Sequence, residues 1–237
     1  MIENLPLYVS VFFGLTTIGT LWIFYRILKN SENLAASLKA SYILIGLALW
    51  LVLQGVLSLN HIYSLRTDSF PPKIVVFGIL PALLAILLVF LSPSGRRFID
   101  GLSLSKLTWL NVIRIPVEIT LYWLFLYQSV PELMTFTGRN FDILAGITAP
   151  FMAWYYSRST GKKSARNWLL VWNFIALALL INIVVIAFFS APSPVQKFAF
   201  EQPNIAILYF PISWLPTFIV PVVLFSHLAA IRQLLYK

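Results

Sequence analysis

The sequence predicts an all-α polytopic membrane protein, a bundle of seven transmembrane helices. Of its 237 residues, 59% are hydrophobic and only 11% are charged, which is more apolar than a soluble domain needs to be. The apolar residues form long continuous runs that do not alternate with polar ones, which favours helices over a β-barrel. The basic residues lie mainly in alternate loops between these runs. We therefore expect residues 1–237 to form one transmembrane domain.

Seven runs are long enough to cross a hydrocarbon core about 30 Å thick. They comprise residues 5–28, 38–60, 73–92, 106–128, 140–157, 167–190 and 205–231. No basic segment precedes the first run and no Ala-x-Ala-like site lies near its end, so we expect a retained helix and not a cleaved signal peptide. The small residues Gly14, Thr17 and Gly19 predict that this helix packs closely inside the bundle.

The distribution of basic residues predicts the orientation in the membrane. The first, third and fifth loops and the C-terminus hold twelve of the 17 Lys and Arg residues, and the other loops hold four. The twelve are Arg26, Lys29, Lys39, Arg96, Arg97, Lys106, Arg158, Lys162, Lys163, Arg166, Arg232 and Lys237, and the four are Arg66, Lys73, Arg139 and Lys197. Because cytoplasmic loops are rich in Lys and Arg, we expect the C-terminus in the cytoplasm and the N-terminus outside.

The last run contains three prolines, Pro211, Pro216 and Pro221. Each proline leaves the carbonyl four residues earlier without its helical donor, so neighbouring groups must bind it. Such a helix is either a kinked span or the wall of a cavity. Leu80-Pro81 and Leu215-Pro216 are followed, at the same spacing, by Phe90 and Phe225. These two matched features allow spans 1–3 and 5–7 to be a repeat.

The fourth run, residues 106–128, carries Arg114 and Glu118 near its middle. At a rise of about 1.5 Å per residue, Arg114 lies about 12 Å from the start of the run and Glu118 about 15 Å from its end. Both positions fall within the hydrocarbon core, where a lone charge costs about 2.5–3.5 kcal/mol. Because residues at i and i+4 share a helix face, we expect the two charges to neutralise each other. Pro116 between them predicts a bend.

Asn111 and Tyr122 extend the same face at similar spacing. One interpretation of this polar stripe is a buried site for a polar or ionic ligand, or a proton relay, in which Arg114 holds an anionic group and Glu118 balances charge or accepts a proton. The alternative is an internal ion pair that locks the fourth helix against its neighbours. The sequence leaves both interpretations open.

The segment before the fifth run supports a second pair of interpretations. In the first, it is an ordinary helix start: Thr137 or Asn140 caps the helix, Asp142 lies in the first turn, and Arg139 pairs with Asp142. In the second, Arg139, Glu132 and Asp142 form the rim of an outward vestibule above the charged stripe. We include Arg139 and Asp142 among the candidate ligand-binding residues.

Several classes of function are disfavoured by what the sequence lacks. It has no cysteine, and His61 and His227 fall at different depths, so we expect no shared metal or haem site. No lysine lies in the middle of a run, which excludes retinal proteins, and no nucleophile motif is visible. The scattered basic residues indicate topology and not nucleic-acid binding. We expect no catalytic residues, no metal and no cofactor. Gln54, Asn173 and Asn182 are predicted to form hydrogen bonds between helices.

Four segments resemble a group of uncharacterised bacterial seven-helix integral membrane proteins. They are Arg114–Glu118, Met134–Gly146, Ser190–Pro194 and Leu215–His227. The resemblance covers the second half of the chain and implies a multi-pass protein of the bacterial cytoplasmic membrane. It implies no activity and no site residues.

The leading hypothesis is that the protein binds or translocates a small molecule or ion in an intramembrane cavity. The candidate site comprises Asn111, Arg114, Glu118, Tyr122, Arg139 and Asp142. The expected partners are the lipid bilayer, an unknown small molecule or ion and a membrane protein, but no nucleic acid. A sensor or membrane-complex subunit is the alternative, and it predicts an apolar groove on the outer surface and a sealed interior. An intramembrane lipid-modifying enzyme is the least favoured hypothesis.

Overall fold

The computed structural model describes residues 2, 5–31, 34–159 and 161–236, and within these ranges it contains helices and no strand. The α-helices are α1 (Leu7–Lys29), α2 (Leu34–Leu59), α3 (Leu80–Leu91), α4 (Pro93–Asp100), α5 (Leu104–Leu110), α6 (Arg114–Leu126), α7 (Asp142–Arg158), α8 (Lys163–Ser190) and α9 (Val220–Tyr236). Short 3₁₀ turns are η2 (Asn111–Ile113), η3 (Glu132–Met134) and η4 (Ala206–Leu208), and π-helical turns are η1 (Val75–Ile79) and η5 (Leu215–Ile219). The all-α prediction is confirmed.

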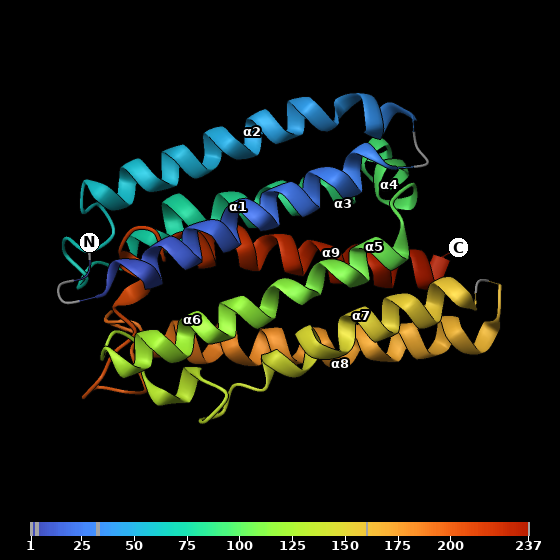
Figure 1. The fold of residues 1–237 in the computed structure, drawn as a ribbon. Coiled ribbons are helices and arrows are strands. Elements are labelled where there is room, and N and C mark those ends of the chain that lie inside the picture. The colour runs from blue at the N-terminus through green and yellow to red at the C-terminus, as the bar shows by residue number, and fades with distance from the viewer. Residues whose placement is uncertain (1, 3–4, 32–33, 160, 237) are drawn as a thin grey trace.

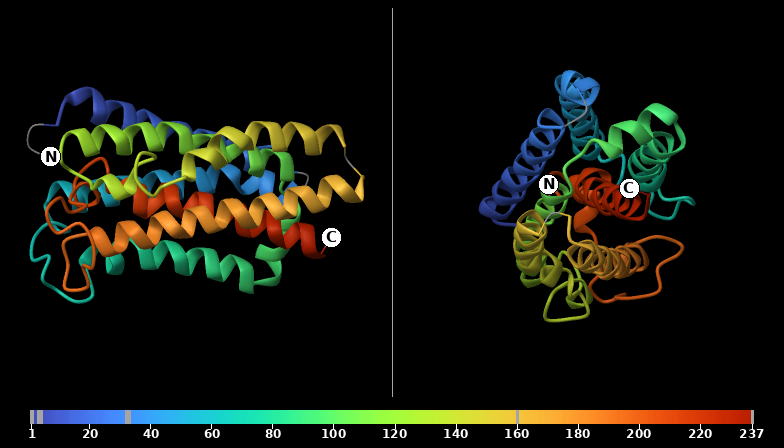
Figure 2. Two further views of the ribbon diagram at one scale, coloured as in Figure 1. Left: turned by 90° about the horizontal axis from the view of Figure 1, so that it is seen from below. Right: turned by 90° about the vertical axis from the view of Figure 1, so that its right-hand side faces the viewer.

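The long helices lie along a common axis, and α4 turns across one end of the bundle (Figure 1). Viewed down this axis, α9 lies near the centre and the other helices surround it (Figure 2). Of the long apolar helices, the stretch that contains α9 is also the most buried. The last helix, from the predicted run that contains three prolines, is therefore the core of the bundle.

Five helical stretches of the described chain are long and apolar enough to cross a membrane. They are Leu7–Lys29, Ser37–Leu59, Leu104–Leu126, Lys163–Ser190 and Leu215–Tyr236. Val75–Leu91 with Pro93–Asp100 is a sixth if this pair, bent by 89°, counts as one span. The helix α7 overlaps the predicted fifth run but has only 17 residues. Large apolar side chains on the outer faces, such as those of Leu15, Leu49 and Phe151, are exposed, as expected of a surface that faces lipid.

Two boundaries differ from the prediction. Residues 93–100, expected in a loop, form α4, because the Ser92 hydroxyl accepts the Gly95 N–H at 3.1 Å and Pro93 occupies the first helical position. The last helix starts at Leu215 and not at residue 205. Pro216 then lies in the first turn, where a missing N–H has no cost.

The two π-helical turns are each followed, after one intervening residue, by a proline. In η5, Pro221 leaves the carbonyl of Thr217 without its helical donor. The indole Nε1 of Trp50, on α2, donates to this carbonyl at 3.0 Å. The hydroxyl of Thr217 in turn donates to the carbonyl of Ser213 at 2.8 Å. A side chain of another helix therefore binds the freed carbonyl, as the sequence predicted.

The turn η1 repeats this arrangement. Pro81 frees the carbonyl of Phe77, which accepts a hydrogen bond from Nε2 of Gln54 at 3.1 Å. The hydroxyl of Tyr63 donates to Oε1 of the same Gln54. Burial raises the pKa of Tyr63 to about 12, so at neutral pH the hydroxyl keeps the proton that it donates. The predicted role of Gln54 in a hydrogen bond between helices is confirmed.

Candidate functional site

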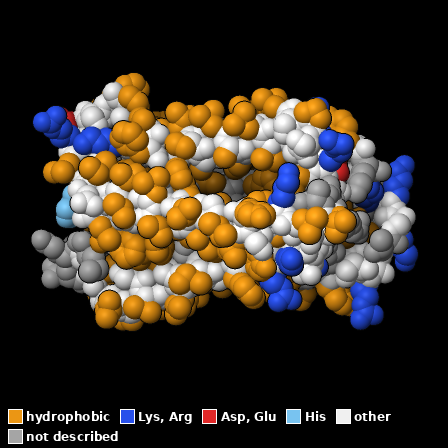
Figure 3. Space-filling model, turned by 90° about the horizontal axis from the view of Figure 1, so that it is seen from above, with side chains coloured by type: hydrophobic (Ala, Val, Ile, Leu, Met, Phe, Trp, Pro, Cys, Tyr) orange, Lys and Arg blue, Asp and Glu red, His pale blue; other side chains and the backbone are white. Residues whose placement is uncertain are grey.

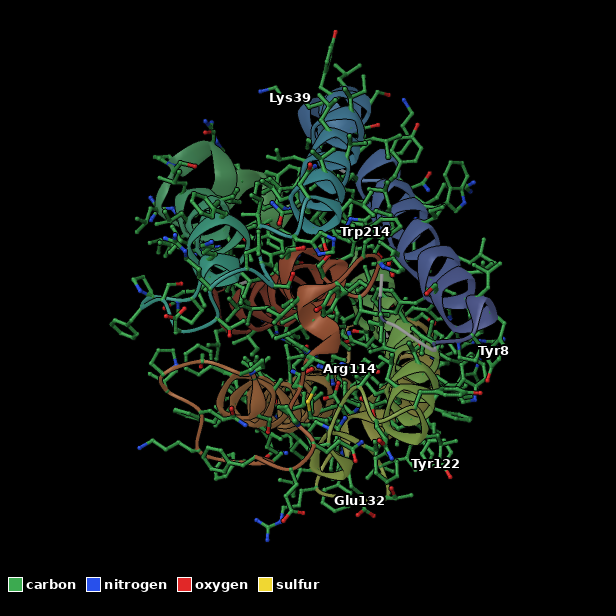
Figure 4. The ribbon with its side chains drawn as sticks, turned by 90° about the vertical axis from the view of Figure 1, so that its left-hand side faces the viewer. Tyr8, Lys39, Arg114, Tyr122, Glu132 and Trp214 are labelled. Atoms are coloured by element: carbon green, nitrogen blue, oxygen red, sulfur yellow. The ribbon has the colours of Figure 1, made fainter. Side chains whose placement is uncertain are left out.

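Arg114 lies at the centre of the bundle (Figure 4). It is the first residue of α6, directly after the 3₁₀ turn η2, and about 15 Å from the start of the α5–η2–α6 stretch. Its side chain is 3% exposed. The two terminal nitrogens donate to the carbonyl of Ala176 on α8 at 3.1 and 3.2 Å. The guanidinium is therefore held by another helix as well as by its own.

The carboxylate that neutralises Arg114 comes from α7. Oδ1 of Asp142 lies 3.2 Å from Nη1 of Arg114, and both side chains are buried. Asp142 is the first residue of α7, where the helix dipole also favours a negative charge. The predicted ion pair between Arg114 and Glu118 is therefore wrong, and so is the predicted pair between Arg139 and Asp142: in the described chain, Asp142 pairs with Arg114.

The close approach of α7 to Arg114 depends on small residues. The buried face of α7 carries Ala145, Gly146, Ala149 and Ala153. A Cβ at Gly146 would lie 3.2 Å from Cβ of Arg114 and 2.9 Å from Cγ1 of Ile115. Only a residue without a side chain lets the two helices come so close at this level.

Glu118 is 1% exposed and has a different partner. Nδ2 of Asn140 donates to both of its carboxylate oxygens, each at 2.7 Å, and to the carbonyl of Met134 at 3.0 Å. Oδ1 of Asn140 accepts the backbone N–H of Asp142 at 3.0 Å. Asn140 therefore links Glu118 to the start of α7. The prediction that Thr137 or Asn140 caps this helix is wrong, because the N-cap position is Phe141 and no side chain makes a cap hydrogen bond there.

His227 on α9 completes the cluster. Its Nε2 lies 3.1 Å from Nη2 of Arg114, and its Nδ1 lies 2.9 Å from Oδ1 of Asn173 on α8. Since a guanidinium only donates, Nε2 must accept and Nδ1 must carry the proton that goes to Asn173. This hydrogen-bond network assigns a neutral imidazole. The sequence predicted a hydrogen bond between helices for Asn173, but no sequence signal placed Asn173 or His227 beside Arg114.

A cavity of about 310 Å³ reaches this cluster. Its walls come from η1, α6, α8, η4, η5 and the start of α9, and they are almost entirely apolar. Arg114, Glu118 and Asp142 are its charged lining residues. Val184 and Val185 of α8 line the cavity and are 39% and 44% exposed, so it opens on the surface beside α8. We call it the central cavity.

The structure brings together three of the six predicted ligand-binding residues, Arg114, Glu118 and Asp142. The other three do not line the central cavity. Asn111 is buried and donates to carbonyls of its own helix, those of Leu107 and Thr108, at 3.2 Å. Tyr122 lies at the periphery, where it stacks on Phe136 (Figure 4). Arg139 is exposed, and its carbonyl accepts a hydrogen bond from Asn182.

A second hollow of about 500 Å³ lies between α2, α3 and α9. Its lining is apolar apart from the hydroxyl of Thr217 and the indole N–H of Trp50. Figure 3 shows a hollow surrounded by apolar side chains on this face of the molecule. We call it the α2–α3 cleft. Opposite faces of the last helix thus line the two hollows, with Ile219 and Val223 in the cavity and Phe218 and Val222 in the cleft.

In the described residues, no group of three or more His, Asp or Glu side chains is placed to hold a metal ion.

Comparison with known proteins places the polar cluster inside a family domain. No curated protein and no solved structure matches the chain. A model for a domain of unknown function, DUF8737, matches residues 71–235, a range that includes Arg114, Asp142 and His227 but not α1 or α2. Because this match covers more than half of the chain, the protein belongs to the DUF8737 family.

Proposed function

We propose that this protein binds a small amphiphilic molecule in the central cavity. The observation that carries the proposal is the chemical character of the cavity lining. Its walls are apolar, and one end is formed by the three buried ionisable residues Arg114, Glu118 and Asp142. The apolar walls suit a hydrocarbon portion of the ligand, and the charged end suits its polar group. A volume of about 310 Å³ lies at the lower end of the usual range for small-molecule sites.

Two unsatisfied atoms support a ligand at the charged end. Nε of Arg114 and Oδ1 of Asp142 are buried and have no hydrogen-bond partner in the described chain, apart from the ion pair between these residues. Buried polar atoms without partners cost about 1–3 kcal/mol each. A polar group in the cavity would bind one or both of them.

The proposal includes the membrane setting. The protein would cross the bacterial cytoplasmic membrane seven times, with its N-terminus outside. Lys and Arg side chains are prominent at the end of the bundle where α4 lies (Figure 3), which supports a cytoplasmic location for that end. The central cavity would then open towards lipid in the outer half of the bilayer, because residues 191–193 of the predicted outer loop line it. The ligand would enter sideways from the bilayer.

The test fills the cavity with a larger side chain. Ile183 lines the cavity and is buried, whereas Ile181 of the same helix is exposed to lipid. The variant Ile183→Trp should lose binding of alkyl probes in nanodiscs, and the matched control Ile181→Trp should keep it. The probes are decyltrimethylammonium, decanol and decanoate, which share one chain and differ in charge. Binding is measured by equilibrium dialysis, with protein-free nanodiscs as background. Equal binding by both variants would place the site elsewhere.

Translocation of the ligand is a further step of the leading hypothesis and is tested separately. If the protein carries its ligand across the membrane, proteoliposomes should show flux of a bound probe that Ile183→Trp abolishes. Binding without flux would mean that the protein binds its ligand and does not translocate it.

A membrane-complex subunit is the second candidate, and the α2–α3 cleft is the observation that favours it. The cleft is apolar and open on the surface of the bundle, as expected of a groove that a partner helix or a lipid chain would cover. The central cavity argues against the sealed interior that this candidate predicts. Substituting Ala82 and Ala85, which line the cleft, by Leu should release a bound partner without affecting probe binding in the cavity.

A further inference from the structure

The charges around the central cavity do not balance. Arg114 contributes one positive charge, and Asp142 and Glu118 contribute one negative charge each when they are ionised. His227 packs against the cluster from α9, and its hydrogen bonds make it neutral. The cluster therefore has a net charge of minus one when both acids are ionised.

The negative charge that lacks a counter-charge belongs to Glu118. The terminal nitrogens of Arg114 are already used by Asp142, by the carbonyl of Ala176 and by His227. Within the described part of the chain, the hydrogen bonds to the Glu118 carboxylate come from the neutral amide of Asn140. Among the described residues, no Lys, Arg or His nitrogen lies within 4.0 Å of the Glu118 carboxylate.

A buried carboxylate without a cation is unfavourable, because burial removes its hydration and the apolar surroundings do not replace it. A single positive charge beside it removes this penalty. That charge is either a proton on the carboxyl group or a cation in the cavity. Because the adjoining walls are apolar, a cation that carries hydrocarbon fits better than a hydrated inorganic ion.

We infer that the central cavity binds a monovalent cationic amphiphile, and that this cation and a proton compete for the carboxylate of Glu118. The inference rests on the proposed function, because it specifies the ligand of the same cavity. It replaces the expectation that Arg114 holds an anionic group, since Asp142 already neutralises this guanidinium. When the cation binds to the protonated protein, the proton leaves the Glu118 carboxyl for the solvent, and the charge of the site stays constant.

The experiment compares the three alkyl probes across a range of pH. The wild-type protein in nanodiscs should bind decyltrimethylammonium more tightly than decanol or decanoate. While Glu118 is protonated, the apparent affinity for this cation should rise about tenfold per unit increase in pH and then level off. Binding in weakly buffered solution should release protons, which an indicator dye detects.

The variant Glu118→Gln removes the charge and keeps the shape and a hydrogen-bond acceptor for Asn140. It should bind decyltrimethylammonium at least tenfold more weakly, without pH dependence and without proton release, while decanol binding is unchanged. Glu132→Gln is the matched control, because Glu132 is exposed and does not line the cavity. If Glu118→Gln does not fold, the probe preference and pH dependence of the wild-type protein still test the inference.

The outcomes separate this inference from the proposed function. Equal binding of the three probes, or tightest binding of decanoate, would overturn the cation inference and leave a general amphiphile site. Cation binding that does not change with pH would overturn the competition with a proton. If no probe binds to the wild-type protein, the proposed function itself is wrong.

Discussion

At the residue scale, the arrangement around Arg114 depends on which carboxylate its guanidinium meets. Glu118 is four residues away on the same helical stretch, yet Asp142 of α7 forms the ion pair. The guanidinium also binds a carbonyl of α8 and the imidazole of α9. Arg114 therefore joins four helical stretches at mid-depth of the bundle. If its carboxylate partner is removed, the guanidinium stays buried among apolar groups without a counter-charge.

We predict that Asp142→Ala lowers the free energy of unfolding by about 3–5 kcal/mol, because it leaves Arg114 buried without its counter-charge. Adding Arg114→Met to this variant should recover most of the loss. The measurement is denaturant-induced unfolding in mixed micelles. Asp68→Ala, at an exposed position, is the control and should change the free energy by less than about 0.5 kcal/mol.

The same method can compare the two carboxylates directly. Double-mutant cycles should give a larger coupling energy for Arg114 with Asp142 than for Arg114 with Glu118. A larger coupling to Glu118 would support the pair expected from helical spacing and contradict the geometry of the structure.

At the element scale, α2 stabilises the two π-helical turns. Trp50 and Gln54 lie one turn apart on α2, and each binds a carbonyl that a proline has freed. The sequence predicted that prolines of the last run would need such donors, and it paired Pro81 with Pro216. In the structure, Pro81 corresponds to Pro221, because these two prolines follow the π-helical turns at the same distance. The donors could not be predicted because they lie on a distant helix.

We predict that Trp50→Phe lowers the free energy of unfolding by about 1–3 kcal/mol, because the carbonyl of Thr217 loses its donor in an apolar environment. Trp168→Phe is the matched control, since Trp168 is 62% exposed on the outer surface of α8. Both variants are compared by unfolding in mixed micelles. A loss of the same size in the control would mean that ring packing matters and the hydrogen bond does not.

At the scale of the whole molecule, the two ends of the bundle differ in charge. Arg232 at the end near α4 forms an ion pair with Asp100, and Arg166 binds carbonyls at the end of α9. Arg96 and Arg97, from a predicted cytoplasmic loop, belong to α4 itself. The proposed orientation, with this end in the cytoplasm, is the one expected from the rule that translocated loops contain few Lys and Arg residues.

We predict that a cysteine replacing Glu201 reacts with a membrane-impermeant maleimide in intact cells. A cysteine replacing Ser164 should react only after the membrane is permeabilised. Both positions are exposed at opposite ends of the bundle, and the chain contains no cysteine of its own, so each variant is labelled at one site. The reverse labelling pattern would invert the proposed topology and would place the cavity in the inner half of the bilayer.

The sequence by itself determined the helical class, the approximate position of the apolar helices and the presence of buried charges in mid-chain. These properties follow from the hydrophobicity and charge of neighbouring residues, which act locally. Only the tertiary structure decided that Arg114 pairs with Asp142, that no cationic nitrogen of the described residues lies within 4.0 Å of the Glu118 carboxylate, and that a cavity reaches both sites. Those facts depend on how closely α7 approaches through Gly146 and on where α8 and α9 present Ala176 and His227. Spacing along one helix carries no information about these distances, because packing between helices sets them.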